Sequence, residues 1–489
     1  MSVEADQSVN GKSWLRTTVT TRSIDARDET IRKHGFGSVF GFNKGIVMQI
    51  VCFEDERVGQ LQPITHARAA YEISCASHRL LDWLRRLPGQ LSVSVRGYLR
   101  EIQWLDQKLK EPGDEVLGEE LLLVNARLVP TVDLLKSLLS VCKDGPSGAL
   151  RDEDGSLLVA RFAAGEVNVA QGSTSENADG GQDSFSPFRK SRGPSSKQLL
   201  ETTGAQLVSQ LVQHAESLPT LAIENVHAFH WPHEVVAWHM KEMPAAMNWR
   251  LDQGGYTETE DGVFVKSGVS LGKYAVVDCD EGPILLDENV KVGPFCMLAG
   301  PVYAGPGTRV IEHAALKDGV ALGHTVKIGG EVEASVIEPY TNKQHHGFLG
   351  HSYLGSWINL GAGTCNSDLK NTYGKINIEY NGQKVSTGMQ FLGCIIGDYS
   401  KTAINTSIFT GKVIGVCSML YGFATTNVPS YMNYARLFGQ QSLLPADVMV
   451  NTQQRMFSRR KVEQRPCDIQ LIHDMYQLTA DERELSEQY

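Results

Sequence analysis

Hydrophobic residues recur every six positions through the second half of the chain. The repeat begins at Val265, slips by three at Glu281-Gly282-Pro283, breaks at Glu338 to Phe348 and ends at Ile414. Its predicted inward positions are Val265, Leu271, Val277, Leu286, Val292, Leu298, Ala304, Val310, Leu316, Leu322, Ile328, Phe348, Leu354, Leu360, Ile396, Thr402, Ile408 and Ile414. A helix needs apolar residues about 3.6 positions apart and an alternating strand about 2 apart, so a period of six favours a short strand plus a turn, repeated. The pattern therefore predicts a parallel β-helix.

Small residues support this interpretation. A small or β-branched residue often stands four places after the inward one, as at Thr308 and Val320, and glycine often follows it directly, as at Gly293. Glycine allows backbone angles that other residues rarely adopt, which suits the corners of a solenoid. The pattern resembles the left-handed hexapeptide β-helix family, in which three such units close one triangular coil. By that resemblance the helix is left-handed and has about six coils.

The first half of the chain predicts an α/β domain. Met48 to Phe53 is an apolar run suited to a buried strand, and further strands are predicted at Leu91 to Val95 and Leu121 to Val124. A helical segment is predicted between them, at Ala69 to Arg86. Helical spacing returns at 197–218 and from Trp231, and strands that alternate with helices are typical of α/β domains.

The predicted organisation has four parts. Residues 1–46 are polar and without a period, which predicts a disordered tail, so that Met48 is a candidate for the true start. Residues 47–250 form the α/β domain, with a flexible insertion at about 171–197 that is rich in Ser, Gly and Pro. Residues 251–425 form the β-helix, and residues 426–489 form a helical segment.

Composition narrows the class of protein. The formal net charge of −10 argues against a nucleic-acid partner, which would favour a basic surface. The 9 cysteines contain no C-x-x-C pair and are predicted to be free thiols in a reducing compartment. No stretch approaches the roughly 20 apolar residues of a membrane span, and no apolar signal core opens the chain. We therefore expect a cytoplasmic protein without a membrane partner.

The break in the repeat is the predicted catalytic corner. It brings Lys343, His345 and His346 together, and Asn359 follows 14 positions after His345 at the start of an Asn-Leu-Gly-Ala-Gly-Thr run. Solenoids accept insertions at corners, where catalytic loops are often found, so an insertion is expected here. Imidazole, with an ordinary pKa near 6.5, is suited to accept a proton at neutral pH.

These residues resemble the acetyltransferase half of GlmU, the bifunctional bacterial enzyme that makes UDP-N-acetylglucosamine. That family has a histidine at the place of His345, a tyrosine at the place of Phe348 and an asparagine at the place of Asn359. A GlmU-like family of sugar nucleotidyltransferases is similar over most of the chain. The shared segments are Phe53-Glu54-Asp55, Leu61 to Thr65, Asn125 to Leu128, Asn342 to Gly355, Asn359 to Gly374 and Arg459-Arg460.

The resemblance implies a role for each candidate residue on the β-helix. His345 is the general base for transfer of an acyl group to a sugar amine, Asn359 holds the acceptor or the developing oxyanion, and Lys343 binds an acidic group of the acceptor. Phe348, which lacks the hydroxyl of the family's tyrosine, and Asn366, in a possible ligand loop that extends to Phe391, are expected to contact substrate. Lys412, Arg459 and Arg460 are expected to bind the phosphates of acetyl-CoA or another acyl-CoA.

The resemblance also implies nucleotidyl transfer by the first domain. Pyrophosphorylases hold a triphosphate with a G-x-G-x-R loop and a later lysine, and that signature is missing after Phe53. By likeness, Arg68 contacts phosphate and Asp55 lies near Mg²⁺. The implied substrates are a sugar phosphate and a nucleoside triphosphate, the implied assembly is a homotrimer, and the first domain is either active or degenerate.

Two other classes of function stay open. γ-Carbonic anhydrases share this prism and bind zinc with three histidines, and His346 and His351 have the spacing of their H-x-x-x-x-H pair, with His313 or His324 as a third ligand. A non-catalytic sugar-nucleotide sensor or scaffold is the other alternative, and the missing glycine-rich loop supports it.

Overall fold

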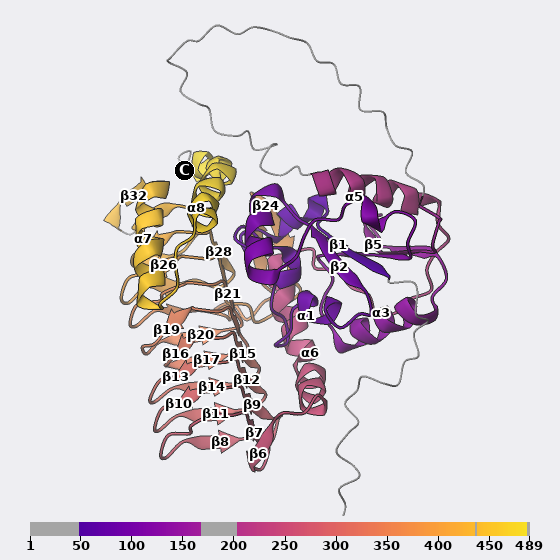
Figure 1. The fold of residues 1–489 in the computed structure, drawn as a ribbon. Helices are drawn as coiled ribbons and strands as arrows, with labels where there is room; N and C mark the ends of the chain where they lie inside the picture. The colour runs from indigo at the N-terminus through magenta and orange to yellow at the C-terminus, as the bar shows by residue number, and fades with distance from the viewer. Residues whose placement is uncertain (1–47, 168–202, 436–437, 487–489) are drawn as a thin grey trace, which may run out of the picture. The chain divides into compact units, whose positions relative to one another are not determined.

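The chain begins with a five-stranded mixed sheet. The computed structural model describes residues 48–167, 203–435 and 438–486, so the predicted tail at 1–46 and the predicted insertion at 171–197 lie outside the described residues. Three of its strands are parallel to one another: β1 (Gln49–Phe53), β2 (Gln90–Ser94) and β3 (Leu121–Asn125). The strand β5 (Leu157–Phe162) is antiparallel to both of its neighbours, β3 and β4 (Gly148–Arg151). The order in the sheet is β2-β1-β3-β5-β4. The α/β domain predicted from the sequence is therefore present (Figure 1).

Helices cover this sheet. They are α1 (Leu80–Leu84), α2 (Arg100–Ile102), α3 (Val132–Asp144), α5 (Thr203–His214) and α6 (Pro232–Asp252). The predicted helix at Ala69 to Arg86 is wrong over most of its length, because only α1 and a short 3₁₀ turn (Ala70–Glu72) form. Between them the backbone makes a tight turn in which Ala76 and Ser77 have φ of 48° and 71°. Two consecutive left-handed residues cannot belong to a right-handed helix.

The second half of the chain is the predicted left-handed parallel β-helix. One face carries β6 (Thr257–Glu260), β7 (Val263–Val265), β9 (Ile284–Leu286), β12 (Val302–Ala304), β15 (Val320–Leu322), β18 (Val336–Ile337), β21 (Tyr353–Leu354), β25 (Cys394–Ile396) and β28 (Lys412–Ile414). Of these nine strands only β6 is antiparallel, which leaves eight stacked parallel strands. The prism therefore has at least eight coils, more than the six expected.

The other faces are built from shorter sheets. One has β10 (Lys291–Val292), β13 (Arg309–Val310), β16 (Lys327–Ile328) and β19 (Asn342–Lys343), and its upper part has β26 (Lys401–Thr402), β29 (Met419–Leu420), β31 (Met432–Ala435) and β32 (Gln440–Leu443). The other has β8 (Val276–Asp278), β11 (Met297–Ala299), β14 (Ala315–Lys317), β17 (Glu331–Glu333) and β20 (Phe348–Gly350), continued by β22 (Cys365–Asn366), β27 (Ser407–Ile408) and β30 (Phe423–Ala424).

The break in the repeat is a shortened coil and not the predicted insertion. Val302 pairs with Val320, 18 positions on, but Ala321 pairs with Val336 after 15 and Val336 with Tyr353 after 17. The lost residues shift the register, so that Leu349 pairs with the buried Val332 and points inward. Phe348 pairs with the exposed Glu331 and points outward, which corrects its predicted inward position.

The loop expected from Asn366 to Phe391 is where the chain has its long insertion. Tyr353 pairs with Ile395, a step of 42 positions instead of 18, so the coil holds 24 extra residues. These residues include a hairpin of β23 (Asn377–Tyr380) and β24 (Gln383–Ser386). The ring of Tyr380 stacks on Trp231, and its hydroxyl accepts from the backbone N–H of His233, so the hairpin packs on the start of α6.

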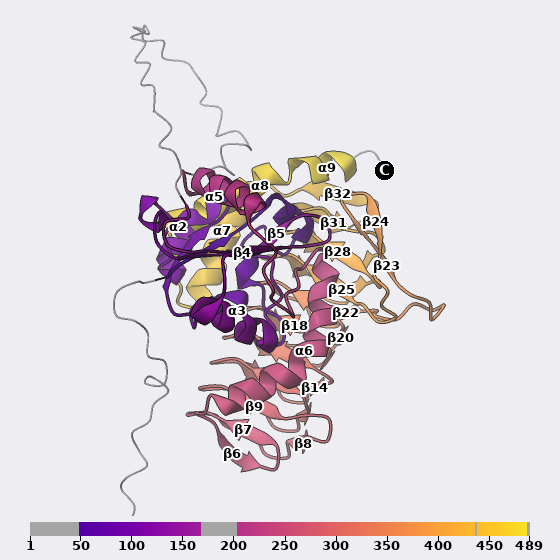
Figure 2. The ribbon, with the colours of Figure 1, turned by 90° about the vertical axis from the view of Figure 1, so that its right-hand side faces the viewer.

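The chain ends in helices beside the last coils. These are α7 (Ala446–Arg459), α8 (Pro466–Leu478) and α9 (Ala480–Ser486), shown in yellow in Figure 2. Because β31 pairs with β29, the sheet continues past residue 425, where the helical segment was expected to begin. Among the described helices none is both long and apolar enough to cross a membrane.

The nine-stranded face is apolar on both sides. Inside the prism it contributes residues such as Leu286, Ala304 and Leu322, and its outer residues Tyr303 and Tyr353 join the hydrophobic core of the α/β domain. Because both sides are buried, the strands of this face have continuous apolar sequences instead of alternating ones. This face positions the α/β domain against the β-helix.

We expect Leu316→Ala to destabilise the β-helix by about 3 kcal/mol, because Leu316 is fully buried at the axis and the prism cannot close around the lost volume. A fall in melting temperature measures the effect. Val276→Ala is the matched control: Val276 is 58% exposed and the change is expected to be nearly neutral. Equal melting temperatures for the two variants would contradict the inward position of Leu316.

Candidate functional site

The half-buried Asp55 pairs with the buried Arg127 at the carboxyl end of the parallel strands. Asp55 follows β1 and caps the next turn, and its carboxylate accepts from Arg127 Nε and Nη2 at 2.8 and 2.7 Å and from Asn125 Nδ2 at 2.8 Å. The Arg127 side chain is fully buried, so Mg²⁺ at Asp55 would have to displace a buried cation. The residues around Asp55 therefore do not fit the Mg²⁺ site expected there.

A second charged group lies at the same edge and was missed in the sequence. The ligand atoms of Asp152, Asp154 and His230 lie within 4.8 Å of one another. Hydrogen bonds to Glu234 and then to Asp152, 2.8 Å from Nε2, raise the pKa of His230 to about 9 against the opposing effect of burial. Without a metal this group is therefore a network of ion pairs at neutral pH, and a metal ion bound here would have to displace the proton of His230.

Arg68 reaches from the α/β domain to the β-helix. Its guanidinium pairs with Glu338 at 3.1 Å and with Asp398, and donates to Ser356 Oγ at 3.0 Å. Burial lowers the pKa of Arg68, but Asp398, Tyr353 and Glu338 outweigh it and raise the pKa well above its usual value. Arg68 also lines a cavity of about 1010 Å³. Its predicted contact with phosphate is thus replaced, in this chain, by two carboxylates.

The predicted catalytic corner lies between β19 and β20. His345 is exposed there, and no partner of its ring is found among the described residues. Asn359 is exposed too and bridges to Asn342, three positions before His345, on the same face. Phe348 is half-buried and points outward from β20, which belongs to a different face. The structure therefore exposes His345 and Asn359 on or directly after the face of β19, and it places Phe348 on another face.

Lys343 and Asn366 are buried and hold the backbone. Lys343 Nζ donates to the carbonyl oxygens of Gly329 and Gly347, both at 2.7 Å, and of His345 at 3.3 Å. Burial lowers the pKa of Lys343 to about 8. The Asn366 side chain accepts from the N–H of Gly350 and donates to its carbonyl. Neither side chain reaches substrate from these positions, so the structure does not favour their predicted contacts with the acceptor.

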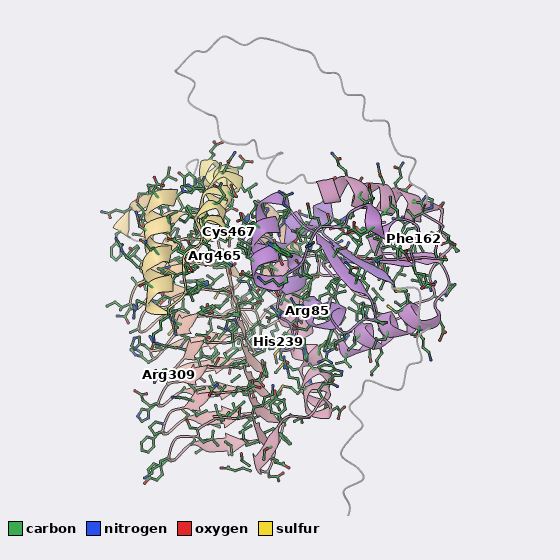
Figure 3. All side chains as sticks on the ribbon, viewed as in Figure 1. Arg85, Phe162, His239, Arg309, Arg465 and Cys467 are labelled. Carbon is green, nitrogen blue, oxygen red and sulfur yellow. The ribbon has the colours of Figure 1, made fainter. Side chains whose placement is uncertain are left out.

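The candidate residues for acyl-CoA lie on different faces. Lys412, in β28, lines a second cavity of about 660 Å³ together with Glu379 and Tyr380. Arg460 donates to Asn342 on the face of β19, and Arg459 is exposed next to it. Lys327 belongs to this second group, because burial and then Arg460, Arg309 and Arg459 lower its pKa. Figure 3 labels Arg309 on this part of the β-helix.

The histidines of the possible zinc site do not gather with one another in the described chain. His313 stacks on Phe295, and His324 meets the ring of Tyr340 edge-on. His351 Nδ1 lies 2.8 Å from Asp368 Oδ2, in a group with Glu333 that does not include His346. The pair of His351 and Asp368, an imidazole oriented by a carboxylate, was not predicted, although the two residues lie 17 positions apart, about one coil of the repeat.

Comparison with known proteins supports the two-part reading. Residues 50–249 match the family described as sugar nucleotidyl transferase. A bifunctional sugar-1-phosphate nucleotidylyltransferase/acetyltransferase of Sulfurisphaera tokodaii is 30% identical over 149 residues, which cover 30% of this chain and 37% of that protein. The bifunctional protein GlmU of Xylella fastidiosa is 30% identical over 190 residues, covering 35% of this chain and 37% of its own length.

Solved structures give a weak likeness. The UDP-N-acetylglucosamine acyltransferase of Francisella novicida has a TM-score of 0.22 and 15% identity, over 41% of this chain and 66% of that one.

We expect the pairing of His230 to depend on pH. Because the folded-state pKa is raised to about 9, its stabilisation is fully present below the ordinary pKa near 6.5 and is lost as pH rises through 9. His230→Gln should therefore lower the free energy of unfolding at pH 6 by about 1 kcal/mol, after allowance for solvent screening, and much less at pH 10; the fall in melting temperature at each pH measures it. His473→Gln, at a more exposed histidine, is the control. A loss that is equal at both pH values would exclude the ion pair.

The chain spans little more than a third of the curated relatives that it matches. Over these parts, the predicted resemblance to sugar nucleotidyltransferases and to bifunctional GlmU proteins is confirmed.

Proposed function

We propose that this protein is a transferase of sugar-nucleotide synthesis, in which the β-helix moves an acyl group from acyl-CoA to the amine of a sugar. The observation that supports this most is that His345 and Asn359 are both exposed, and that Asn359 pairs with Asn342, three positions before His345. The similarity to bifunctional nucleotidylyltransferase/acetyltransferases is in accord with it. As in the expectation from the sequence, the protein acts in the cytoplasm.

His345 serves as the general base. An ammonium group has no free electron pair, so it must lose a proton before its nitrogen attacks the thioester carbonyl. The exposed imidazole accepts that proton, the new C–N bond forms, and the C–S bond breaks with release of the CoA thiol. Lys343 supports this step through the backbone, because its ammonium group donates to the carbonyl oxygens of His345 and Gly347 and so fixes the turn that carries His345.

Asn359 provides the donor for the oxyanion or the acceptor. Its side chain is exposed on the same face as Asn342, and a side-chain N–H aimed at the carbonyl oxygen stabilises the negative charge that develops there. Phe348, at the start of the strand that follows His345, offers an apolar surface and lacks the hydroxyl of the family's tyrosine. This favours an acceptor that makes one hydrogen bond fewer than the substrate of GlmU.

Cations for the phosphates of acyl-CoA are supplied on the face of β19. Arg459 and Arg460 lie there with Arg309 and Lys327, and the lowered pKa of Lys327 and Arg460 reflects burial and mutual repulsion. A phosphate would relieve that repulsion. Lys412 faces a different cavity and is not part of this group.

The α/β domain is proposed to bind a nucleotide or a sugar phosphate. The family match over 50–249 supports this, while the pairing of Asp55 with Arg127 argues for a site that does not use Asp55 as a metal ligand. A thermal-shift screen with acetyl-CoA, UTP, dTTP and sugar phosphates tests both ligands. If none of them shifts the melting curve, the alternative of a non-catalytic scaffold is favoured.

A homotrimer is proposed from the resemblance. His345 and Asn359 are exposed in the single chain, as expected for groups that a neighbouring prism would help to enclose. Light scattering measures the assembly.

We expect His345→Ala to lower kcat for acyl transfer by a factor of about 10² to 10⁴, because the substitution removes the general base. The melting temperature should stay unchanged, because the side chain is exposed. Release of the CoA thiol with a panel of amino-sugar phosphates measures the rate. His346→Ala, the adjacent exposed histidine, is the matched control and should keep the rate. Wild-type turnover in His345→Ala, together with loss in His351→Ala, would transfer the role of base to the His351–Asp368 pair.

A further inference from the structure

A large cavity lies away from both proposed reaction sites. It has a volume of about 1010 Å³ and is bounded by α1, the turn before it, the end of α6, the β-helix and the α7–α8 connection. Asp55, Arg127 and His345 are not among the described residues that line it. The volume is that of a typical site for a small molecule.

Buried polar atoms in the lining have no protein partner. Within the described residues these are Arg68 Nε, His78 Nε2, Trp83 Nε1 and Asp398 Oδ2. All four side chains are more than nine-tenths buried, and buried polar atoms are nearly always hydrogen-bonded in native proteins. Although these atoms are covered by neighbouring protein atoms, they make the wall of this cavity polar.

Six arginines line the cavity, and carboxylates neutralise only some of them. Arg68 pairs with Glu338 and Asp398, Arg79 with Asp82, and Arg465 with Asp106 and Asp468. The other three hydrogen-bond to neutral oxygens in the described chain: Arg85 to Gln107, Arg86 to Gln253 and Arg250 to Ser77. Asp82 and Asp287 act on Arg86 and Arg250 from a distance, but no direct ion pair of these three arginines is found in the described chain, which leaves their guanidinium groups suited to an anion.

Aromatic rings hold two of these guanidinium groups in place. Arg86 lies 4.3 Å from the ring centre of Trp249, and Arg250 lies 4.1 Å from that of Tyr303. Stacking fixes the plane of a guanidinium while its N–H groups stay available at the edge. Arg250 also donates hydrogen bonds to the carbonyl and the hydroxyl of Ser77. The φ of Ser77, 71°, is unfavourable for a residue with a side chain. A strained backbone held beside such groups is typical of ligand sites.

We propose that this cavity binds a phosphorylated small molecule, with its phosphate oxygens held by Arg85, Arg86 and Arg250. The planar fork of arginine matches two phosphate oxygens at once. The cavity differs in position from the edge of the α/β sheet and from the His345 corner, so the proposal does not rest on either proposed reaction. Inorganic pyrophosphate, a sugar 1-phosphate and a nucleoside diphosphate share this chemistry.

The test is a titration of the full-length protein followed by tryptophan fluorescence, because Trp83, Trp249 and Trp357 line the cavity. The probes are inorganic pyrophosphate, glucose 1-phosphate and UDP. At least one is expected to give a saturable change, and the double variant Arg85→Gln/Arg86→Gln should raise its Kd tenfold or more, since two charge-assisted contacts are lost. Arg455→Gln, the same change at an exposed arginine of α7 that does not line the cavity, should leave the Kd unchanged.

Arg85 and Arg86 are both exposed, so the double variant is expected to keep the wild-type melting temperature. Arg250→Gln, deeper in the cavity, is the second variant and should weaken binding in the same way. Equal affinity for pyrophosphate and UDP would mean that only phosphate is recognised, and tighter binding of UDP that the nucleoside is recognised too. The proposal is overturned if no probe changes the fluorescence, or if the double variant binds as the wild type does. Acyl transfer at the His345 corner would be unaffected in either case.

Discussion

The buried ion pairs of Arg68 connect the two halves of this protein. The guanidinium leaves the α/β domain and is enclosed by Glu338 and Asp398, which follow β18 and β25, on two coils of the β-helix separated by the coil of β21. Taking these charges out of water is costly, and losing one partner leaves a buried charge worth about 3–5 kcal/mol. Glu338 is held further by the backbone N–H and hydroxyl of Ser74 and by the hydroxyl of Tyr353. The shortened coil that begins at Glu338 and carries His345 is therefore fixed relative to the α/β domain.

The β-helix could be predicted because its period is local. Each inward residue of the prism, such as Leu298 or Leu316, must be apolar since it meets only other inward residues. The period does not show how many residues a coil has lost, so Phe348 was placed inside where Leu349 lies. The continuous apolar run Ile284-Leu285-Leu286 carried a further signal: a strand that is apolar on both sides must be covered outside as well. That signal indicates where the α/β domain packs.

The candidate site was predictable only in part. The motif around His345 and Asn359 places both on an accessible face, in accord with its resemblance to acetyltransferases. Lys343 was predicted to bind the acceptor, because the sequence does not show whether a lysine is buried or exposed. Only the fold shows that its three N–H donors are used by backbone carbonyls. Pairs such as His230 and Asp152, 78 positions apart, come together through the fold alone.

The two candidate bases of the β-helix, His351 and His345, each lack a different feature of a catalytic histidine. His351 has an orienting carboxylate in Asp368, which fixes Nδ1 as the donor and leaves Nε2 free to accept a proton, but Phe391 stacks on its ring. The imidazole of His345 is exposed, but it has no orienting partner among the described residues. Acyl transfer needs a base and an oxyanion donor within reach of one carbonyl, and Asn359 shares its face with the strand that leads to His345. His351 follows β20, on another side of the prism. The face that Asn359 shares with this strand therefore favours His345, and in the proposed homotrimer a neighbouring prism would supply the group that orients its ring.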